Sequence, residues 1–192
     1  MSFDNNDWTV LFIGGASGTG KSSIAYELAE YYNVNVMEAD DVCEAVKAMT
    51  TIKSHPAIHY WSTGVNWLDI GVTENVEWLI RVSKEITPAL KAIAERHIVD
   101  NLPVIIEGDF IHPELVKDFN TPEVKGVFLK EQDKNQIMQN YLAREGGELQ
   151  HYRAEISIAY DKWLSCFCEK SEVKVVESRP WDTVVKRIVE CL

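Results

Sequence analysis

Short apolar runs alternate with longer amphipathic stretches along most of the chain. Each short run suits a β-strand that is buried on both faces. We expect such strands at residues 8–14, 34–39, 103–108, 124–130 and 173–178. Apolar positions at helical spacing predict helices at residues 22–32, 40–49, 74–100, 133–143, 150–170 and 181–192. Because Pro88 removes a helix hydrogen bond, the helix at 74–100 should kink or divide near Thr87.

The alternation of strands and helices predicts the fold class. Parallel neighbouring strands need long crossover connections, and helices usually supply them. We therefore expect one α/β domain over residues 1–192, with a doubly wound, five-stranded parallel sheet covered by helices on both faces. Residues 51–73 are irregular and interrupt the alternation.

The turn after the first predicted strand carries the most specific motif. It reads IGGASGTGKSS and contains the complete G-x-x-x-x-G-K-[ST] pattern between a predicted strand and a predicted helix. In that context, backbone N–H groups and the helix N-terminus hold nucleotide phosphates. We expect Lys21 to reach the β- and γ-phosphates and Ser22 to ligate Mg²⁺. The expected nucleotide-binding residues are Gly15, Ala16, Ser17, Gly18, Thr19, Gly20, Lys21, Ser22 and Ser23.

On this motif the chain resembles the small P-loop kinases, the group that contains nucleoside monophosphate, shikimate and gluconate kinases. The stretches GGASGTGKSSIAYELA, MEADDVCEAV and IIEGDFIHPEL are most similar to 2-phosphoglycerate kinases. The resemblance covers nearly the whole chain and implies a three-layer P-loop NTPase domain with a helical lid. It also implies ATP and Mg²⁺ as cofactors. The implied reaction transfers the γ-phosphoryl group to a hydroxyl of a small metabolite that can be anionic, similar to 2-phosphoglycerate.

Carboxylates follow the second and third predicted strands. The carboxyl ends of strands in an open α/β sheet line the crevice beside the phosphate loop. We expect Asp40 to face the acceptor hydroxyl and take its proton, with Asp41 as the next candidate, although either aspartate could cap the following helix. Glu107 is expected to orient the Mg²⁺ shell and Asp109 to contact the acceptor. A solvent-exposed turn is the alternative for these last two.

Two glycines between helical patterns, in the sequence REGGE, have an arginine on either side. A kinase must exclude water from its phosphoryl donor, and a mobile lid commonly does so. We expect residues 141–155 to form this lid, and the resemblance implies that Arg144 and Arg153 bind the ATP phosphates and act in catalysis. Two surface arginines on a helical hairpin are the alternative.

The turn after the last predicted strand reads ESRPWDTVV. In the kinases that this chain resembles, an arginine or a proline at this point often lies against the adenine ring. Arg179 and Pro180 are therefore expected to bind the nucleotide base. The alternative is a plain turn in which Pro180 starts the last helix.

The acceptor side is expected to be covered by an insertion at about residues 51–100. The candidate acceptor-binding residues there and after the third strand are His55, His59, Arg81 and His112. The alternative for each histidine is an ordinary structural hydrogen bond, and His112 could simply start a helix together with Pro113. The tryptophans of this segment could line the acceptor pocket or simply pack in the interior.

Charge and composition narrow the class of partner. The formal net charge of −11 argues against general binding to nucleic acid or to an anionic membrane surface. No apolar run approaches the ~18 residues of a membrane span, and the first residues lack the features of a signal peptide. We expect a cytoplasmic monomer or homodimer that binds a small-molecule acceptor and neither nucleic acid nor membrane.

Two other functions are compatible with a phosphate loop. One is a nucleotide-binding regulatory NTPase, although the guanine signature N-K-x-D is absent from the sequence. The other is a phosphotransferase that acts on an antibiotic, a nucleoside or a macromolecule. Acceptor-stimulated release of ADP would distinguish either kinase from a regulatory NTPase.

Overall fold

A parallel β-sheet forms the centre of the molecule. The computed structural model describes residues 7–192. Its strands are β1 (Val10–Gly15), β2 (Asn35–Glu38), β3 (Val104–Gly108), β4 (Val124–Lys130) and β5 (Lys174–Glu177). They lie in the order β2-β3-β1-β4-β5, and every neighbouring pair is parallel. This confirms the expected α/β fold class.

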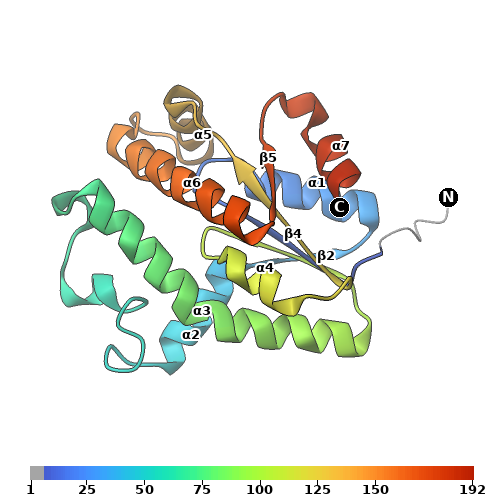
Figure 1. The fold of residues 1–192 in the computed structure, drawn as a ribbon. Coiled ribbons are helices and arrows are strands. Elements are labelled where there is room, and N and C mark those ends of the chain that lie inside the picture. Colours follow the sequence, from blue (N-terminus) through green and yellow to red (C-terminus); the bar gives the residue numbers. More distant parts are fainter. Residues whose placement is uncertain (1–6) are drawn as a thin grey trace.

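Helices cover both faces of the sheet (Figure 1). They are α1 (Lys21–Tyr32), α2 (Ala39–Met49), α3 (Val72–Asp100), α4 (Pro113–Phe119), α5 (Lys134–Glu145), α6 (His151–Ser171) and α7 (Trp181–Cys191). The irregular segment before α3 contains two short 3-10 helices, at Tyr60–Thr63 and Trp67–Asp69. Within residues 7–192, no helix is both long and apolar enough to cross a membrane.

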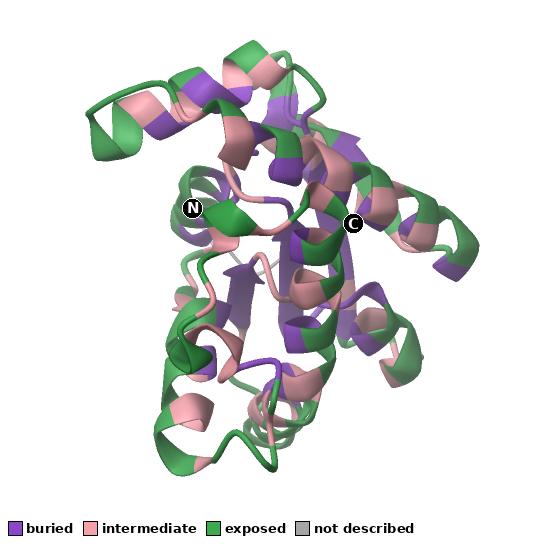
Figure 2. Cartoon of the chain, turned by 90° about the vertical axis from the view of Figure 1, so that its left-hand side faces the viewer, coloured by how far each residue is buried: buried purple, intermediate pink, exposed green. Residues whose placement is uncertain are grey.

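Successive residues of each strand point to opposite faces of the sheet, so both faces are apolar. Leu11 and Ile105 belong to the core on the side of α1 and α7. Their neighbours Phe12 and Ile106 belong to the core on the side of α3, α4 and α6. Figure 2 shows the result, with buried strands at the centre and exposed residues on the outer sides of the helices.

The strand order places a crevice at the carboxyl ends of β1 and β3. The chain leaves β1 towards β2 on one side, whereas it leaves β3 towards β4 on the other. Such a reversal between neighbouring strands opens a crevice where ligands commonly bind. Because Gly14 pairs with Gly108, the turn after β1 and the turn after β3 meet at the same level.

Helix α3 continues through Pro88, so the expected division near Thr87 is wrong. The alternative expectation, a kink, agrees with the bend that Figure 1 shows about midway along the helix. Buried side chains from both halves hold the helix to the core, and this packing offsets the ~3 kcal/mol cost of an internal proline. They are Val82, Ile86, Leu90 and Ala94.

Helix α2 begins close against β3. Its N-cap is Glu38, which makes no side-chain capping bond, so the expectation that Asp40 or Asp41 caps this helix is wrong. Both aspartates lie in the first turn, where negative charge complements the helix dipole. A Cβ on Gly108 would lie 2.7 Å from the Cβ of Ala39, so only glycine permits this approach. The start of α2 is thereby held beside the crevice.

Candidate active site

The phosphate loop between β1 and α1 curls at its glycines. Gly18 and Gly20 have φ angles of +80° and +95°, a region that side-chain-bearing residues rarely adopt. The hydroxyl of Thr19 donates to the carbonyl of Ala16 at 2.9 Å. From α5, the amide of Asn140 donates to the carbonyl of Gly18 at 2.7 Å. Local and tertiary contacts therefore both hold the loop in its curled form.

Lys21 is a buried cation at the centre of the site. Its Nζ donates to the carbonyl of Ala16 at 2.9 Å and forms an ion pair with Asp109, two residues after Glu107. Burial alone would lower the pKa of Lys21, but the negative charges of Asp109 and Glu107 outweigh it and raise the pKa above its usual value. The ammonium group is therefore charged at neutral pH.

The side-chain oxygens of Ser22, at the start of α1, and Glu107, at the end of β3, lie side by side. The Ser22 hydroxyl donates to Oε1 of Glu107 at 2.8 Å. Burial raises the pKa of Glu107, although Lys21 and the Ser22 bond act in the opposite direction. Residues 7–192 contain no cluster of three or more metal-ligating side chains. Mg²⁺ that accompanies a nucleotide takes most of its ligands from phosphate and water, so a hydroxyl and a carboxylate oxygen fit it.

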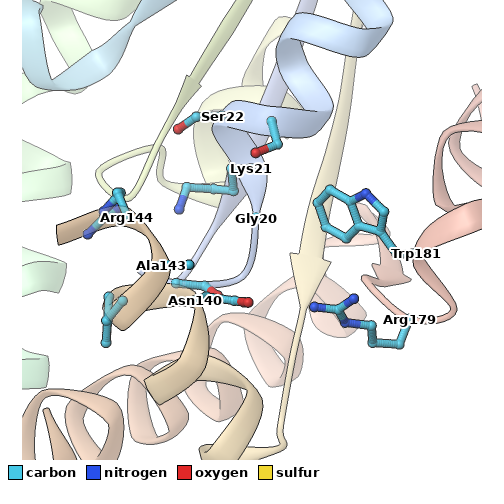
Figure 3. Close-up of a pocket in the computed structure, with 11 residues that line it drawn as sticks. Gly20, Lys21, Ser22, Asn140, Ala143, Arg144, Arg179 and Trp181 are labelled. Atoms are coloured by element: carbon cyan, nitrogen blue, oxygen red, sulfur yellow. The ribbon is translucent and has the colours of Figure 1, made fainter. Parts of the chain in front are cut away.

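A cleft of about 510 Å³ opens beside the loop (Figure 3). Figure 3 shows Arg144 and Ala143 of α5 on one side of it and Arg179 and Trp181 on the other. The remaining lining residues are Gly18, Gly20, Lys21, Ser22, Ser23, Asn140 and Tyr141. The cleft thus joins most of the predicted phosphate loop to one predicted lid arginine and to Arg179.

Trp181 was not predicted, and it lines the cleft beside Arg179. Pro180 is the N-cap of α7 and does not line the cleft. A Cβ on Gly20 would lie 2.6 Å from the Trp181 ring, which shows how closely the indole covers the loop. The guanidinium of Arg179 lies 5.2 Å from the centre of the same ring. The available signal was the aromatic residue directly after Arg-Pro.

The two predicted lid arginines share a carboxylate. Glu145 binds Arg153 at 2.9 Å and also pairs with Arg144. Hydrogen bonds from Gln150 and these arginines lower the pKa of Glu145 to about 2. Both guanidinium groups also lie over the ring of Tyr141, at 5.4 Å for Arg144 and 4.3 Å for Arg153.

Asp40 lies among the charged groups of the crevice. The protein atoms packed around its carboxylate and the charge of Asp109 raise its pKa to about 6 although the residue as a whole remains exposed, and Lys21 opposes the shift. The side chains of Asp40 and Asp41 are both exposed, and neither lines the cleft. Asp40 therefore interacts electrostatically with Lys21 and Asp109, although neither aspartate lines the cleft.

A second cavity, of about 260 Å³, lies on the other side of Asp109. The tryptophans of the insertion line this cavity and also pack together, with the rings of Trp61 and Trp78 4.7 Å apart. Ser17 of the phosphate loop reaches the cavity as well. The other lining residues are Trp67, Asn75, Leu79, Phe110, Arg153, Ile156, Ser157 and Tyr160. Neither Asp40 nor Asp41 lines it.

The other predicted acceptor residues lie outside both cavities beside the loop. His55 and His59 each contact a nearby hydroxyl at 3.1 Å. Arg81 lies over the ring of Tyr60, 5.7 Å from its centre. His112 is buried at the start of α4, where its Nδ1 accepts from a backbone N–H at 3.3 Å. The contacts of the three histidines agree with the structural alternatives that the sequence left open, whereas none was stated for Arg81.

Comparison with known proteins finds relatives among archaeal enzymes, and no family model matches the chain. A 2-phosphoglycerate kinase of Methanocaldococcus jannaschii is 30% identical over 113 residues, which cover 57% of this chain and 36% of that protein. A 2-phosphoglycerate kinase of Methanopyrus kandleri is 26% identical over 195 residues, covering 94% of this chain and 59% of that protein. The chain thus spans less than two thirds of the length of these relatives.

Among solved structures, a shikimate kinase from Acinetobacter baumannii in complex with shikimate superposes with a TM-score of 0.60. The match covers 96% of this chain and 92% of that one, at 13% sequence identity. At this identity the likeness shows a shared fold.

Proposed function

We propose that this chain, which has the fold of the P-loop small-molecule kinases and is similar to archaeal 2-phosphoglycerate kinases, is an ATP- and Mg²⁺-dependent phosphotransferase. The observation that carries the proposal is the position of Asp109. This carboxylate pairs with Lys21 of the phosphate loop and also lines the second cavity. A kinase needs a donor site and an acceptor site that meet at one point, whereas a nucleotide switch needs only the first.

In this proposal, ATP occupies the cleft of Figure 3 with its phosphates on the loop. Lys21 and Arg144 contact the phosphates and offset the negative charge that develops in the transition state. Arg179 and Trp181 hold the base. Ser22 and Glu107 would hold Mg²⁺, which when bound neutralises phosphate charge and orients the phosphoryl group.

The tip of the α5–α6 hairpin, about residues 141–155, serves as the lid in this proposal. It carries Arg144 and Arg153, and its loop contains Gly146 and Gly147, both with positive φ. Closing it over the cleft would exclude water from the γ-phosphoryl group. We infer that Arg144, which lines the cleft, exchanges Glu145 for ATP phosphates when the hairpin closes, whereas Arg153 lines the second cavity.

The acceptor in this proposal is a small metabolite whose hydroxyl faces the γ-phosphoryl group from the second cavity. Asp109 lines that cavity, so it is placed to accept the hydroxyl proton, and Asp40 lies nearby with a pKa of about 6. The names of the relatives make 2-phosphoglycerate the first acceptor to test.

The test is release of ADP from Mg·ATP, measured with and without pools of hydroxylated metabolites that include 2- and 3-phosphoglycerate. Stimulation by one pool supports a kinase, and division of that pool identifies the acceptor. Hydrolysis that no pool changes would instead support a regulatory NTPase and contradict the proposal.

A further inference from the structure

The walls of the second cavity are mostly aromatic or apolar. Trp61, Trp67 and Trp78 of the insertion face Phe110 and Tyr160 from the other side of the site. Such surfaces favour planar rings, because aromatic groups stack or meet edge to face. The cavity of about 260 Å³ has room for one or two rings, since about 150 Å³ is enough to hold benzene.

The charges of this cavity suit an acceptor that carries little negative charge. Arg153 is the one cationic side chain among its described lining residues, and Asp109 adds a negative charge. Arg153 already contacts both carboxylate oxygens of Glu145 at 2.9 Å and the amide oxygen of Gln150 at 3.0 Å. A phosphorylated acid brings a phosphate of roughly −1.5 to −2 and a carboxylate. One engaged arginine cannot compensate those charges when water is excluded.

Hydrogen-bonding groups are available at defined places in the cavity. In residues 7–192, no hydrogen-bond partner is recorded for the indole N–H of Trp61 or of Trp67, whereas Trp78 donates to a backbone carbonyl at 2.9 Å. The hydroxyl of Tyr160 donates to the backbone carbonyl of Asp109 at 3.0 Å and fixes the turn that carries this carboxylate. An acceptor would therefore make its polar contacts with Asp109 at one end of the cavity and with the indole N–H groups of Trp61 and Trp67.

We propose that the acceptor is a hydroxylated compound with a planar ring and at most one acidic group. This rests on the proposed phosphoryl transfer and names its substrate class. The ring packs against the tryptophans that line the cavity, and a single acidic group meets Arg153. The acceptor oxygen bonds to the γ-phosphorus of ATP as the bond to the β–γ bridging oxygen breaks. ADP leaves with that electron pair, and the hydroxyl proton passes to the carboxylate of Asp109.

The experiment compares two acceptor panels with the same Mg·ATP. The ring panel contains pyridoxine, tyrosol, mandelate and adenosine, and the acid panel contains 2-phosphoglycerate, 3-phosphoglycerate, glycerate and gluconate. We expect a member of the ring panel to stimulate ADP release about tenfold or more and the acid panel to leave it near the basal rate. Stimulation by the acid panel alone would overturn the substrate class while leaving the proposed function intact.

Variants link the effect to the cavity. Trp67→Ala should lower kcat/KM for the ring acceptor about tenfold to a hundredfold. Tyr31→Ala removes an aromatic side chain that is 54% exposed and far from the cavity lining, and it should have no effect. If Trp67→Ala does not fold, Trp67→Phe keeps a ring and should retain most of the activity. Equal losses in Trp67→Ala and Tyr31→Ala would contradict the assignment.

Tryptophan fluorescence separates failure of this inference from failure of the proposed function. If neither panel stimulates ADP release, phosphoryl transfer is overturned. The assignment of the acceptor then falls with it, but the preference of the cavity for planar rings stands if ring compounds quench the fluorescence of the wild-type protein and quench Trp67→Ala less. This preference is overturned if they quench neither protein.

Discussion

At the scale of single residues, buried charges show which groups the site requires. Lys21 is the residue whose charge links the phosphate loop to the turn after β3, through Asp109 and Glu107. Asp161 is a buried carboxylate on α6 that lies away from both cavities. It accepts hydrogen bonds from the segment after β4. Lys21 has a partner of opposite charge, whereas burial is the main influence on the pKa of Asp161.

Replacement of Lys21 by alanine should abolish nucleotide turnover while the protein remains folded, because the loop loses its contact to the β- and γ-phosphates. ADP release and circular dichroism measure the two effects. Lys186→Ala is the control, since this lysine on α7 is 76% exposed and pairs only with the neighbouring turn of its own helix. Full activity in Lys21→Ala would exclude the proposed phosphate site.

Asp161→Asn should stabilise the protein at high pH. Burial raises the pKa of Asp161 to about 7, far above its value of about 3.9 in an unfolded chain. Protonated Asp161 therefore contributes to the free energy of unfolding. This contribution is complete below pH ~4 and is lost as the pH rises through about 7. We expect the variant to gain about 1 to 3 kcal/mol at pH ~8 and nothing at pH ~4, measured by urea unfolding. Asp182→Asn, at an exposed position, should show no such difference.

At the scale of elements, the position of α5 against the phosphate loop couples the predicted lid to the nucleotide. The contact depends on Gly18, where a Cβ would lie 2.9 Å from Ile137 and 3.1 Å from Tyr141. Both of these side chains belong to the small core that joins α5 to α6. A change at Gly18 therefore reaches the whole hairpin.

Gly18→Ala should weaken Mg·ATP binding about tenfold or more and lower the free energy of unfolding by about 1 to 3 kcal/mol. Gly147→Ala is a matched control, because its φ of +78° resembles the +80° of Gly18 but its Cβ would meet nothing within 4 Å. Calorimetric titration and urea unfolding measure both quantities. Equal effects of the two substitutions would show that backbone strain alone matters and that the contact with α5 does not.

Glu145→Gln should strengthen nucleotide binding, since the carboxylate holds both lid arginines by ion pairs. Loss of its charge leaves Arg144, which lines the cleft, freer to contact phosphates, and we expect a gain in affinity of about two- to fivefold. Glu148→Gln, at an exposed position of the same loop, is the control. Unchanged or weaker binding in Glu145→Gln would contradict an exchange of Glu145 for phosphate.

At the scale of the whole molecule, the site joins parts that are distant in the chain. The loop after β1, the turn after β3, the α5–α6 hairpin and the start of α7 all reach the cleft or the adjoining cavity. A ligand that binds across these parts stabilises the folded state more than the unfolded one. Its effect should therefore appear in global stability.

Saturating Mg·ATP should raise the melting temperature. At a hundred times Kd the gain is about 2.7 kcal/mol, which corresponds to roughly 5 to 10 °C for a chain of this size. Differential scanning fluorimetry measures the shift, with Lys186→Ala behaving as wild type. Lys21→Ala should shift far less at the same nucleotide concentration. A shift of equal size in Lys21→Ala would place the nucleotide elsewhere.

The sequence alone determined the strands, their parallel arrangement and the phosphate loop. These features depend on local periodicity and on spacing within one turn, which a linear pattern contains. The resemblance to the small P-loop kinases also pointed to Arg144 and Arg179, and both line the cleft. Only the tertiary structure decided which residues line the acceptor cavity and that Trp181 covers the loop. Trp61 and Tyr160 are far apart in the chain, and the packing of α3 against α6 brings them to one cavity. No periodicity records such a contact, because it depends on how elements distant in sequence pack in space.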